Sequence, residues 1–137
     1  MLTALSIRDI VLVDVLEDDP RWAEWSIRQL RAQSQVHALT INPIIYAELS
    51  SAFSTLEALD AVIERLRLEW RELSRPALFL AGKAFARYRR AGGSKTQVLA
   101  DFFIGAQAAV ESCPILTRDP RRYATYFPTV RLITPTA

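Results

Sequence analysis

Short β-rich runs that alternate with capped helical segments constrain the fold of this chain most. The run at 37–41, His-Ala-Leu-Thr-Ile, suits a buried strand, and Asn42 with Pro43 directly after it is typical of a helix start. Two further β-rich runs lie at 114–117 and 129–133. Strands that alternate with helices predict an α/β fold with a small parallel sheet covered by helices on both faces.

Helix-start signals of one type, a capping side chain followed by a helix former, recur along the chain. They are Asp19 with Pro20, Ser54 with Glu57, and Ser94 with Gln97. We therefore predict helices from 19 to about 35, from 54 to about 67 and from 98 to about 112, and a helical turn at 121–126. Gly92 and Gly93 end the helix before Ser94. Residues 67–76 leave room for one short strand.

Composition excludes several classes of protein. The chain has 137 residues, of which half are hydrophobic and 23% are charged, a profile typical of one globular domain spanning residues 1–137. No apolar run reaches the roughly 18 residues that a membrane-spanning helix needs, and no basic stretch precedes an apolar one at the start, so we expect a cytoplasmic protein without a membrane anchor. One cysteine, Cys113, and one histidine, His37, exclude an internal disulfide and a Cys/His zinc site.

The positive charge is carried almost entirely by arginine. Of the 17 cationic side chains 15 are arginines, and arginine suits bidentate contacts with phosphate. A cationic cluster consists of Lys83, Arg87, Arg89, Arg90 and Lys95. This pattern favours a nucleic-acid partner, and a solvated helix face is the alternative.

With one histidine and one cysteine, any catalysis must come largely from carboxylates or hydroxyls. Ligands of open parallel sheets bind beyond the carboxyl ends of the strands. Asp119 directly follows the β-rich run at 114–117, where Thr117 could point its hydroxyl into the same crevice. The alternative for Asp119 is a capping role, because Pro120 follows it.

Two more candidate acids lie on predicted helices. Glu48 is in the second turn of the helix that starts after Asn42, where a solvated carboxylate is the alternative. Asp101 lies in an almost wholly apolar segment, and Gly105 and Ala108 are on the same side of the helix, which would leave room for a ligand. The alternative for Asp101 is a favourable interaction with the helix dipole.

Asp9 and Asp14 lie in the apolar stretch at the start of the chain, so at least one of them should have a specific role. Carboxylates that gather without histidine or thiolate suit a hard cation such as Mg²⁺ or Mn²⁺. A cation of this kind supports phosphoryl chemistry because it neutralises phosphate and lowers the pKa of the attacking water. The arginines would then hold a phosphate backbone.

Four segments, in this order, resemble the PIN-domain nucleases and, within them, the VapC-type toxins of bacterial toxin–antitoxin pairs. They read Val-Leu-Val-Asp-Val-Leu-Glu-Asp-Asp-Pro-Arg-Trp at 11–22, Ile-Asn-Pro-Ile-Ile-Tyr-Ala-Glu-Leu-Ser at 41–50, Leu-Ala-Asp-Phe-Phe-Ile-Gly-Ala at 99–106 and Ile-Leu-Thr-Arg-Asp at 115–119. The resemblance implies a helix-rich three-layer α/β/α sandwich, a Mg²⁺- or Mn²⁺-dependent endoribonuclease, a homodimer and inhibition by a cognate antitoxin. By motif, Glu48, Asp101 and Asp119 resemble three acidic residues of the family.

The chain departs from the family at the first acidic position. The family usually reads Asp-Thr-Asn or Asp-Thr-Ser at the end of the first strand, where this chain reads Arg-Asp-Ile at 8–10. Without a gap Arg8 falls on the family's aspartate, whereas the loss of one residue from the turn puts Asp9 there. Because neighbours on a strand point to opposite faces and a buried arginine costs desolvation, we expect Asp9 to point toward Asp101 and Arg8 to turn outward. The alternative is that Arg8 occupies the site and pairs with Asp101 or Glu48 in place of the cation.

The resemblance makes a metal-dependent endoribonuclease toxin the leading hypothesis. In it, Asp9 and Asp101 hold the cation directly or through water, Glu48 and Asp119 orient water molecules, and Thr117 supports them. The alternative is a catalytically impaired PIN-like domain that mainly binds an antitoxin. Arg8 favours it, because it stands where the family has a carboxylate. A receiver-like phosphoacceptor domain is a third hypothesis, but it needs a lysine near a late strand, and both lysines lie in the helix-rich middle.

Aromatic residues predict a surface for a partner. Trp22, Trp25, Tyr46, Phe53 and Trp70 exceed what one thin core layer requires, and the segments that carry them could form a dimer face or an antitoxin groove. The alternative is that most of them belong to the core.

Overall fold

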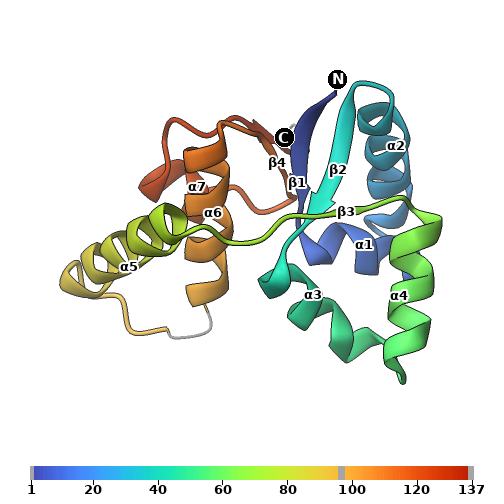
Figure 1. Cartoon of the computed structure of the whole chain (residues 1–137), viewed down its shortest axis with the longest axis horizontal. Helices are drawn as coiled ribbons and strands as arrows, with labels where there is room; N and C mark the ends of the chain where they lie inside the picture. The colour runs from blue at the N-terminus through green and yellow to red at the C-terminus, as the bar shows by residue number, and fades with distance from the viewer. Residues whose placement is uncertain (1, 96–97, 136–137) are drawn as a thin grey trace.

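A five-stranded parallel sheet forms the centre of the computed structural model, which describes residues 2–95 and 98–135 (Figure 1). The strand order is β3-β2-β1-β4-β5. The strands are β1 (Thr3–Ile7), β2 (His37–Ile41), β3 (Glu69–Trp70), β4 (Ile115–Leu116) and β5 (Leu132–Ile133). Central β1 pairs with β2 through Ser6 and Thr40, and with β4 through Ile7 and Leu116. All carboxyl ends therefore face one edge of the sheet, as predicted.

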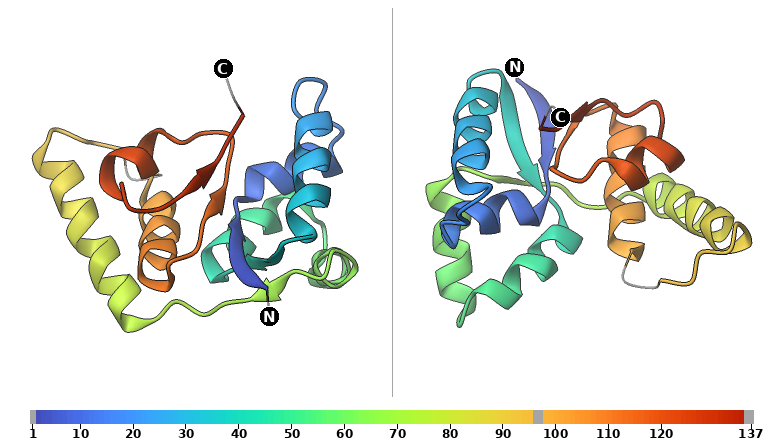
Figure 2. Two further views of the ribbon diagram at one scale, coloured as in Figure 1. Left: turned by 90° about the horizontal axis from the view of Figure 1, so that it is seen from above. Right: turned by 180° about the vertical axis from the view of Figure 1, so that it is seen from behind.

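Helices cover both faces of the sheet in a three-layer α/β/α arrangement (Figures 1 and 2). They are α1 (Asp9–Leu16), α2 (Ala23–Ser34), α3 (Pro43–Leu49), α4 (Leu56–Arg65), α5 (Arg75–Arg90), α6 (Leu99–Glu111) and α7 (Arg121–Tyr126), with a short 3-10 turn at Ser50–Ala52. Helices α1 and α2 lie on one side and α5, α6 and α7 on the other, while α3 and α4 extend beyond the carboxyl ends of β1 and β2 (Figure 1). The predicted helix-rich α/β fold is confirmed.

Local capping chemistry accounts for several helix starts. The side chain of Asn42 accepts a hydrogen bond from the amide of Ile45 at 2.9 Å, so the predicted start of α3 is confirmed. The predicted cap of α4 was one residue early, because Thr55 rather than Ser54 accepts from the amide of Ala58. The Ser94 capping box involves Gln97, which lies outside the described residues.

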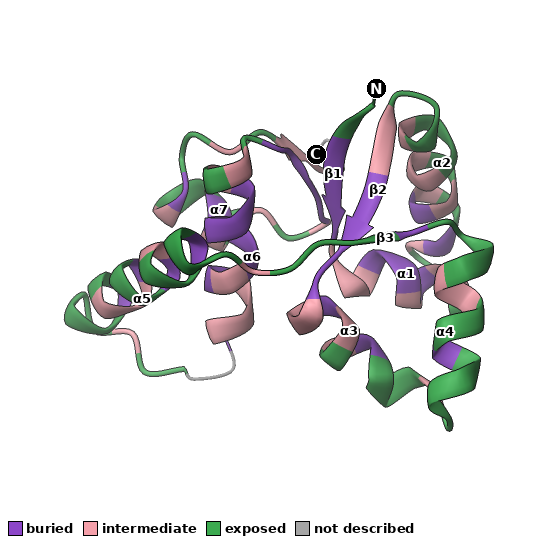
Figure 3. Ribbon diagram, in the orientation of Figure 1, coloured by how far each residue is buried: buried purple, intermediate pink, exposed green. Residues whose placement is uncertain are grey.

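The core follows the strands and the inner faces of α1 and α6 (Figure 3). Leu5, Ile7 and Phe102 are fully buried. We expected Gly105 to leave room for a ligand beside Asp101, and this was wrong. The Phe127 ring fills that space, since a Cβ atom on Gly105 would lie 2.4 Å from it. None of the helices in the described ranges is long and apolar enough to cross a membrane.

Candidate active site

Three carboxylates converge where β1 ends. Asp9 opens α1, Glu48 lies on α3 and Asp101 lies in the first turn of α6. We call these three side chains the acidic cluster. Residues that lie far apart in the sequence come together here because the parallel strands present their carboxyl ends at one edge.

The guanidinium group of Arg8 lies within the acidic cluster. Its Nη1 donates to Oε1 of Glu48 at 2.6 Å and its Nη2 to Oε2 of the same carboxylate at 3.3 Å. Nη2 also lies 3.2 Å from Oδ1 of Asp9 and 3.4 Å from Oδ1 of Asp101. Only 11% of the Arg8 side chain is exposed. One guanidinium group thus contacts all three carboxylates.

The expectation that Arg8 turns outward was wrong. Arg8 is not a strand residue facing away from Asp9, because β1 ends at Ile7 and Asp9 already belongs to α1. The backbone amide of Arg8 donates to the carbonyl of Leu116 at 3.1 Å, which holds the residue at the edge of the sheet. The desolvation cost that argued against an inward arginine is offset here by ion pairs with three carboxylates.

Burial favours the protonated form of two carboxyl groups of the cluster, Asp9 and Asp101. It raises the pKa of Asp9 to about 6, while the Arg8 charge opposes the shift and Glu48 adds to it. Burial also raises the pKa of Asp101, again against the Arg8 charge. The pKa of Arg8 lies above its usual value because its charged neighbours outweigh the opposing effect of burial. The guanidinium group is therefore charged at every physiological pH.

Tyr123 is a contact of the cluster that the sequence analysis missed. Its hydroxyl donates to Oδ1 of Asp101 at 3.0 Å, and its ring is almost completely buried. Burial raises the pKa of Tyr123 well above its ordinary value, so the hydroxyl remains a donor. No local signal in the sequence marks this tyrosine, because its partner lies 22 residues away on another helix.

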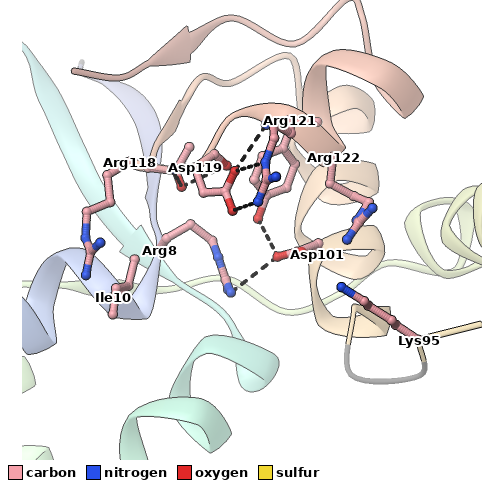
Figure 4. A pocket seen from close by; sticks show the side chains of 10 residues that line it. Arg8, Ile10, Lys95, Asp101, Arg118, Asp119, Arg121 and Arg122 are labelled. Atoms are coloured by element: carbon pink, nitrogen blue, oxygen red, sulfur yellow. Dashed lines mark hydrogen bonds and ion pairs between the residues drawn. The ribbon is translucent and has the colours of Figure 1, made fainter. Parts of the chain in front are cut away.

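Asp119 and Thr117 lie near Asp101 but outside the acidic cluster. They line a cleft of about 500 Å³ together with Arg8 and Asp101 (Figure 4). The Asp119 carboxylate, which is 63% exposed, pairs with Arg121 at 3.1 Å. This contact lowers the pKa of Asp119. The buried Thr117 hydroxyl accepts from the Asp119 amide at 3.1 Å, so it supports the turn that carries this carboxylate.

Cationic side chains outnumber acidic ones around this cleft. Its charged lining residues are Arg8, Lys95, Arg118, Arg121, Arg122, Asp101 and Asp119. Within the described ranges, neither Lys95 nor Arg122 has a carboxylate within 4 Å. The Arg122 guanidinium lies 5.1 Å from the centre of the Tyr88 ring, and the Lys95 amide donates to the Tyr88 hydroxyl. Figure 4 shows both cations directed toward the same part of the cleft.

A second arginine–carboxylate contact lies beside the cleft. Arg118 donates through Nε and Nη2 to both oxygens of Asp14, at 2.9 and 3.0 Å. The Ser26 hydroxyl donates to the same carboxylate at 3.1 Å. Because Asp14 belongs to α1 and Arg118 precedes α7, the pair fixes the 117–120 turn against the first helix. Asp14 thus has the specific role that its apolar surroundings predicted.

The sequence matches one protein family over most of its length. The family model of the PIN domain matches residues 11–128. The chain belongs to the PIN domain family. Arg8 and Asp9 precede the matched segment, so the unusual start of this PIN domain lies outside it. No curated protein matches the sequence closely enough to count as a relative.

Solved structures share the fold of this PIN domain over nearly its whole length. A chain of VapBC2 from Rickettsia felis, in a complex with a promoter DNA fragment, is 18% identical with a TM-score of 0.73, covering 96% of this chain and 98% of that one. A chain of DNA-bound VapBC from Salmonella typhimurium is 20% identical with a TM-score of 0.71, covering 98% of both. A chain of a toxin–antitoxin complex from Klebsiella pneumoniae is 18% identical with a TM-score of 0.67, also covering 98% of both.

The cluster does not fit the divalent cation that PIN nucleases generally use. The Arg8 guanidinium contacts each carboxylate that would have to converge on a metal ion. In the described part of the chain, no three histidine, cysteine, aspartate or glutamate side chains are arranged to hold a metal. The carboxylates that we predicted as ligands, Asp9 and Asp101, therefore face a guanidinium group in this PIN domain.

Proposed function

We propose that the chain is a toxin-type PIN protein of a toxin–antitoxin pair, that its cleft binds RNA, and that its hydrolytic activity is impaired. The observation that carries the impaired activity is the position of Arg8 among Asp9, Glu48 and Asp101. The pairing with an antitoxin is supported by the full-length fold similarity to chains of toxin–antitoxin complexes.

RNA is the proposed ligand because two of the cations that line the cleft have no carboxylate within 4 Å among the described residues. Most cleft cations have acidic partners, such as Arg118 with Asp14 and Arg121 with Asp119. Lys95 and Arg122 are available for phosphate oxygens, and Arg122 stacks on Tyr88 in a position that a backbone phosphate could reach. Phosphate contacts carry no sequence information, so we expect binding with little dependence on sequence.

RNA binding provides a direct test of this assignment. We expect Lys95→Ala and Arg122→Ala each to weaken binding of a labelled single-stranded RNA several-fold and to reduce the slope of log K against log salt by about 0.7. Arg65→Ala on α4 is the matched control, because it removes one exposed arginine away from the cleft. Equal effects of all three substitutions would show that the cleft is not the binding site.

A metal-dependent endoribonuclease is the second candidate function. The convergence of Asp9, Glu48 and Asp101 favours it, and Asp119 and Thr117 line the same cleft as Asp101. In this candidate Asp9 and Asp101 are the Mg²⁺ or Mn²⁺ ligands, and Glu48, Asp119 and Thr117 support the attacking water. It requires that the Arg8 guanidinium leave the cluster.

Cleavage assays separate the two candidates. We expect the purified protein to bind single-stranded RNA equally well with Mg²⁺, Mn²⁺ or chelator, and to cleave it only slowly in all three conditions. Rapid cleavage that appears with Mn²⁺ or Mg²⁺ and disappears with chelator would establish the endoribonuclease instead.

Of the five aromatic residues predicted at a partner surface, three pack against the core, as the alternative held for most of them: Trp25, Tyr46 and Phe53. The rings of Trp22 and Trp25 lie 6.2 Å apart, and those of Tyr46 and Trp70 lie 5.5 Å apart. Trp70 is 47% exposed. We propose that such surfaces contact the antitoxin and a second copy of the chain. Light scattering that gives a strict monomer, alone and with the product of the neighbouring gene, would contradict this proposal.

A further inference from the structure

We propose that Arg8 is the resident cation of the acidic cluster: its guanidinium takes the place of a divalent cation, and its removal creates a divalent-cation site. The consequence for RNA rests on the proposed function, whereas metal uptake can be measured without RNA.

The contacts of Arg8 are those expected of a bound cation. A single group contacts carboxylates from α1, α3 and α6 at distances of 2.6 to 3.4 Å. The group is also held from the backbone side, because the Arg8 amide bonds to Leu116 of β4. It therefore joins three helices at the edge of the sheet, a role that a metal ion coordinated by the same carboxylates would otherwise have.

A divalent cation and the guanidinium cannot share this cluster without strong repulsion. A cation bound by Asp9, Glu48 and Asp101 would lie within a few ångströms of Arg8, where like charges repel strongly in a partly buried site. Arginine stays protonated throughout the accessible pH range, so a change of pH does not remove the competing charge. The unsubstituted protein should therefore be indifferent to Mg²⁺ and Mn²⁺ at this position.

The cluster holds more negative charge than Arg8 can neutralise. Three carboxylates face one guanidinium group. Oδ1 of Asp9 is buried and, among the described residues, lacks a hydrogen bond even though it lies within ion-pair distance of Arg8. Such a set of oxygens suits a doubly charged ion better than a singly charged one. As placed around Arg8 the three carboxylates are not arranged to hold a metal, so a divalent cation that replaces the guanidinium would have to draw them closer together.

The experiment is a Mn²⁺ titration that follows free Mn²⁺ by electron paramagnetic resonance. We expect the unsubstituted protein to bind no stoichiometric Mn²⁺ at millimolar concentration. Arg8→Ala should bind one Mn²⁺ per chain, with an affinity at least tenfold higher than any residual binding by the unsubstituted protein. Arg8→Lys, which keeps a cation, should resemble the unsubstituted protein. The double variant Arg8→Ala/Asp101→Asn should lose the Mn²⁺ that Arg8→Ala gains.

Two results would overturn the proposal. One is Mn²⁺ binding by the unsubstituted protein that Asp101→Asn abolishes, and the other is a folded Arg8→Ala that binds no Mn²⁺. If Arg8→Ala folds only when Mn²⁺ is present, the metal has replaced the guanidinium and the proposal stands. If it does not fold at all, Arg8→Gln is titrated by the same criteria. Failure of RNA binding, by contrast, would overturn the proposed function and leave the metal result unaffected.

Discussion

Two arginine–carboxylate contacts lie side by side in this PIN domain, and they differ in how completely their charges are matched. Arg118 and Asp14 form a one-to-one pair in which both carboxylate oxygens are bonded and Ser26 adds a third donor. Arg8 instead faces three carboxylates, and one oxygen of Asp9 is buried without a hydrogen bond to any residue that the structure describes. Similar chemistry thus produces a satisfied contact and an unsatisfied one, each through an arginine that lines the same cleft.

The difference distinguishes a structural pair from a candidate site. Asp14 is only 2% exposed, and its pair with Arg118 fixes a turn against a helix. The acidic cluster keeps excess charge, and its carboxylates are 19–29% exposed. Carboxylates that are close together without enough partners destabilise the fold, so their convergence indicates a functional constraint rather than a stabilising one. Substitutions at the two places should therefore have different effects.

Asp14→Ala should have the largest effect on stability. It leaves Arg118 without its partner and removes two hydrogen bonds between α1 and the 117–120 turn and one between α1 and Ser26 of α2. Breaking a buried pair in this way should lower the free energy of unfolding by about 3 kcal/mol. Urea unfolding measures the change, with exposed Glu64→Ala on α4 as the control. A loss no larger than that of the control would show that the pair is not structural.

The sequence predicted most elements of the fold because their signals are local. The strand 37–41 and the cap Asn42 were identified correctly, and the helical turn at 121–126 matches α7 residue for residue. Adjacent serine and threonine residues explain the misplaced cap of α4, since Ser54 and Thr55 have the same capping chemistry and only the backbone path decides between them. Local signals thus determine which elements form better than they determine where each one begins.

The candidate site depended more on contacts that are distant in the sequence. Arg8 points inward because it pairs with Glu48 and because Leu116 fixes its backbone. Glu48 is 40 residues away in the sequence, and neither contact is visible in the residues around position 8. Tyr123 was missed for the same reason. Gly105, interpreted as room for a ligand, accommodates the Phe127 ring of a later segment. The positions of the acidic residues could be predicted from motifs, whereas the side chains that contact them could be identified only from the tertiary structure.

Asp101→Asn should affect chemistry more than stability. The substitution keeps the side-chain shape and lowers the negative charge of a cluster that already has too much, so the free energy of unfolding should change by less than about 1 kcal/mol. Any Mg²⁺- or Mn²⁺-dependent cleavage of single-stranded RNA should disappear with the charge. Urea unfolding and gel-based cleavage assays test the two parts. Unchanged cleavage would remove Asp101 from the candidate site, and a large loss of stability would make it structural like Asp14.

Asp9→Asn should produce a small change in stability, and it should stabilise the protein at neutral pH. Burial and Glu48 raise the pKa of Asp9 to about 6, and Arg8 only partly opposes them. Between about pH 4, where an unfolded aspartate ionises, and about pH 6, the folded protein holds a proton that the unfolded chain has released. The stability contributed by Asp9 is therefore full below this window, falls as the pH rises through it and stays low above it.

Asparagine cannot ionise, so Asp9→Asn should lack this loss. We expect the free energy of unfolding of the variant to exceed that of the unsubstituted protein by about 1 kcal/mol at neutral pH, and the two to be equal below about pH 4. Urea unfolding of both proteins across this range isolates the effect of Asp9, because the contribution of Asp101, whose pKa is also raised by burial, largely cancels in the difference. If the variant were instead less stable at neutral pH, the ion pair between Arg8 and Asp9 would outweigh burial, and the acidic cluster would resemble the satisfied Asp14–Arg118 pair.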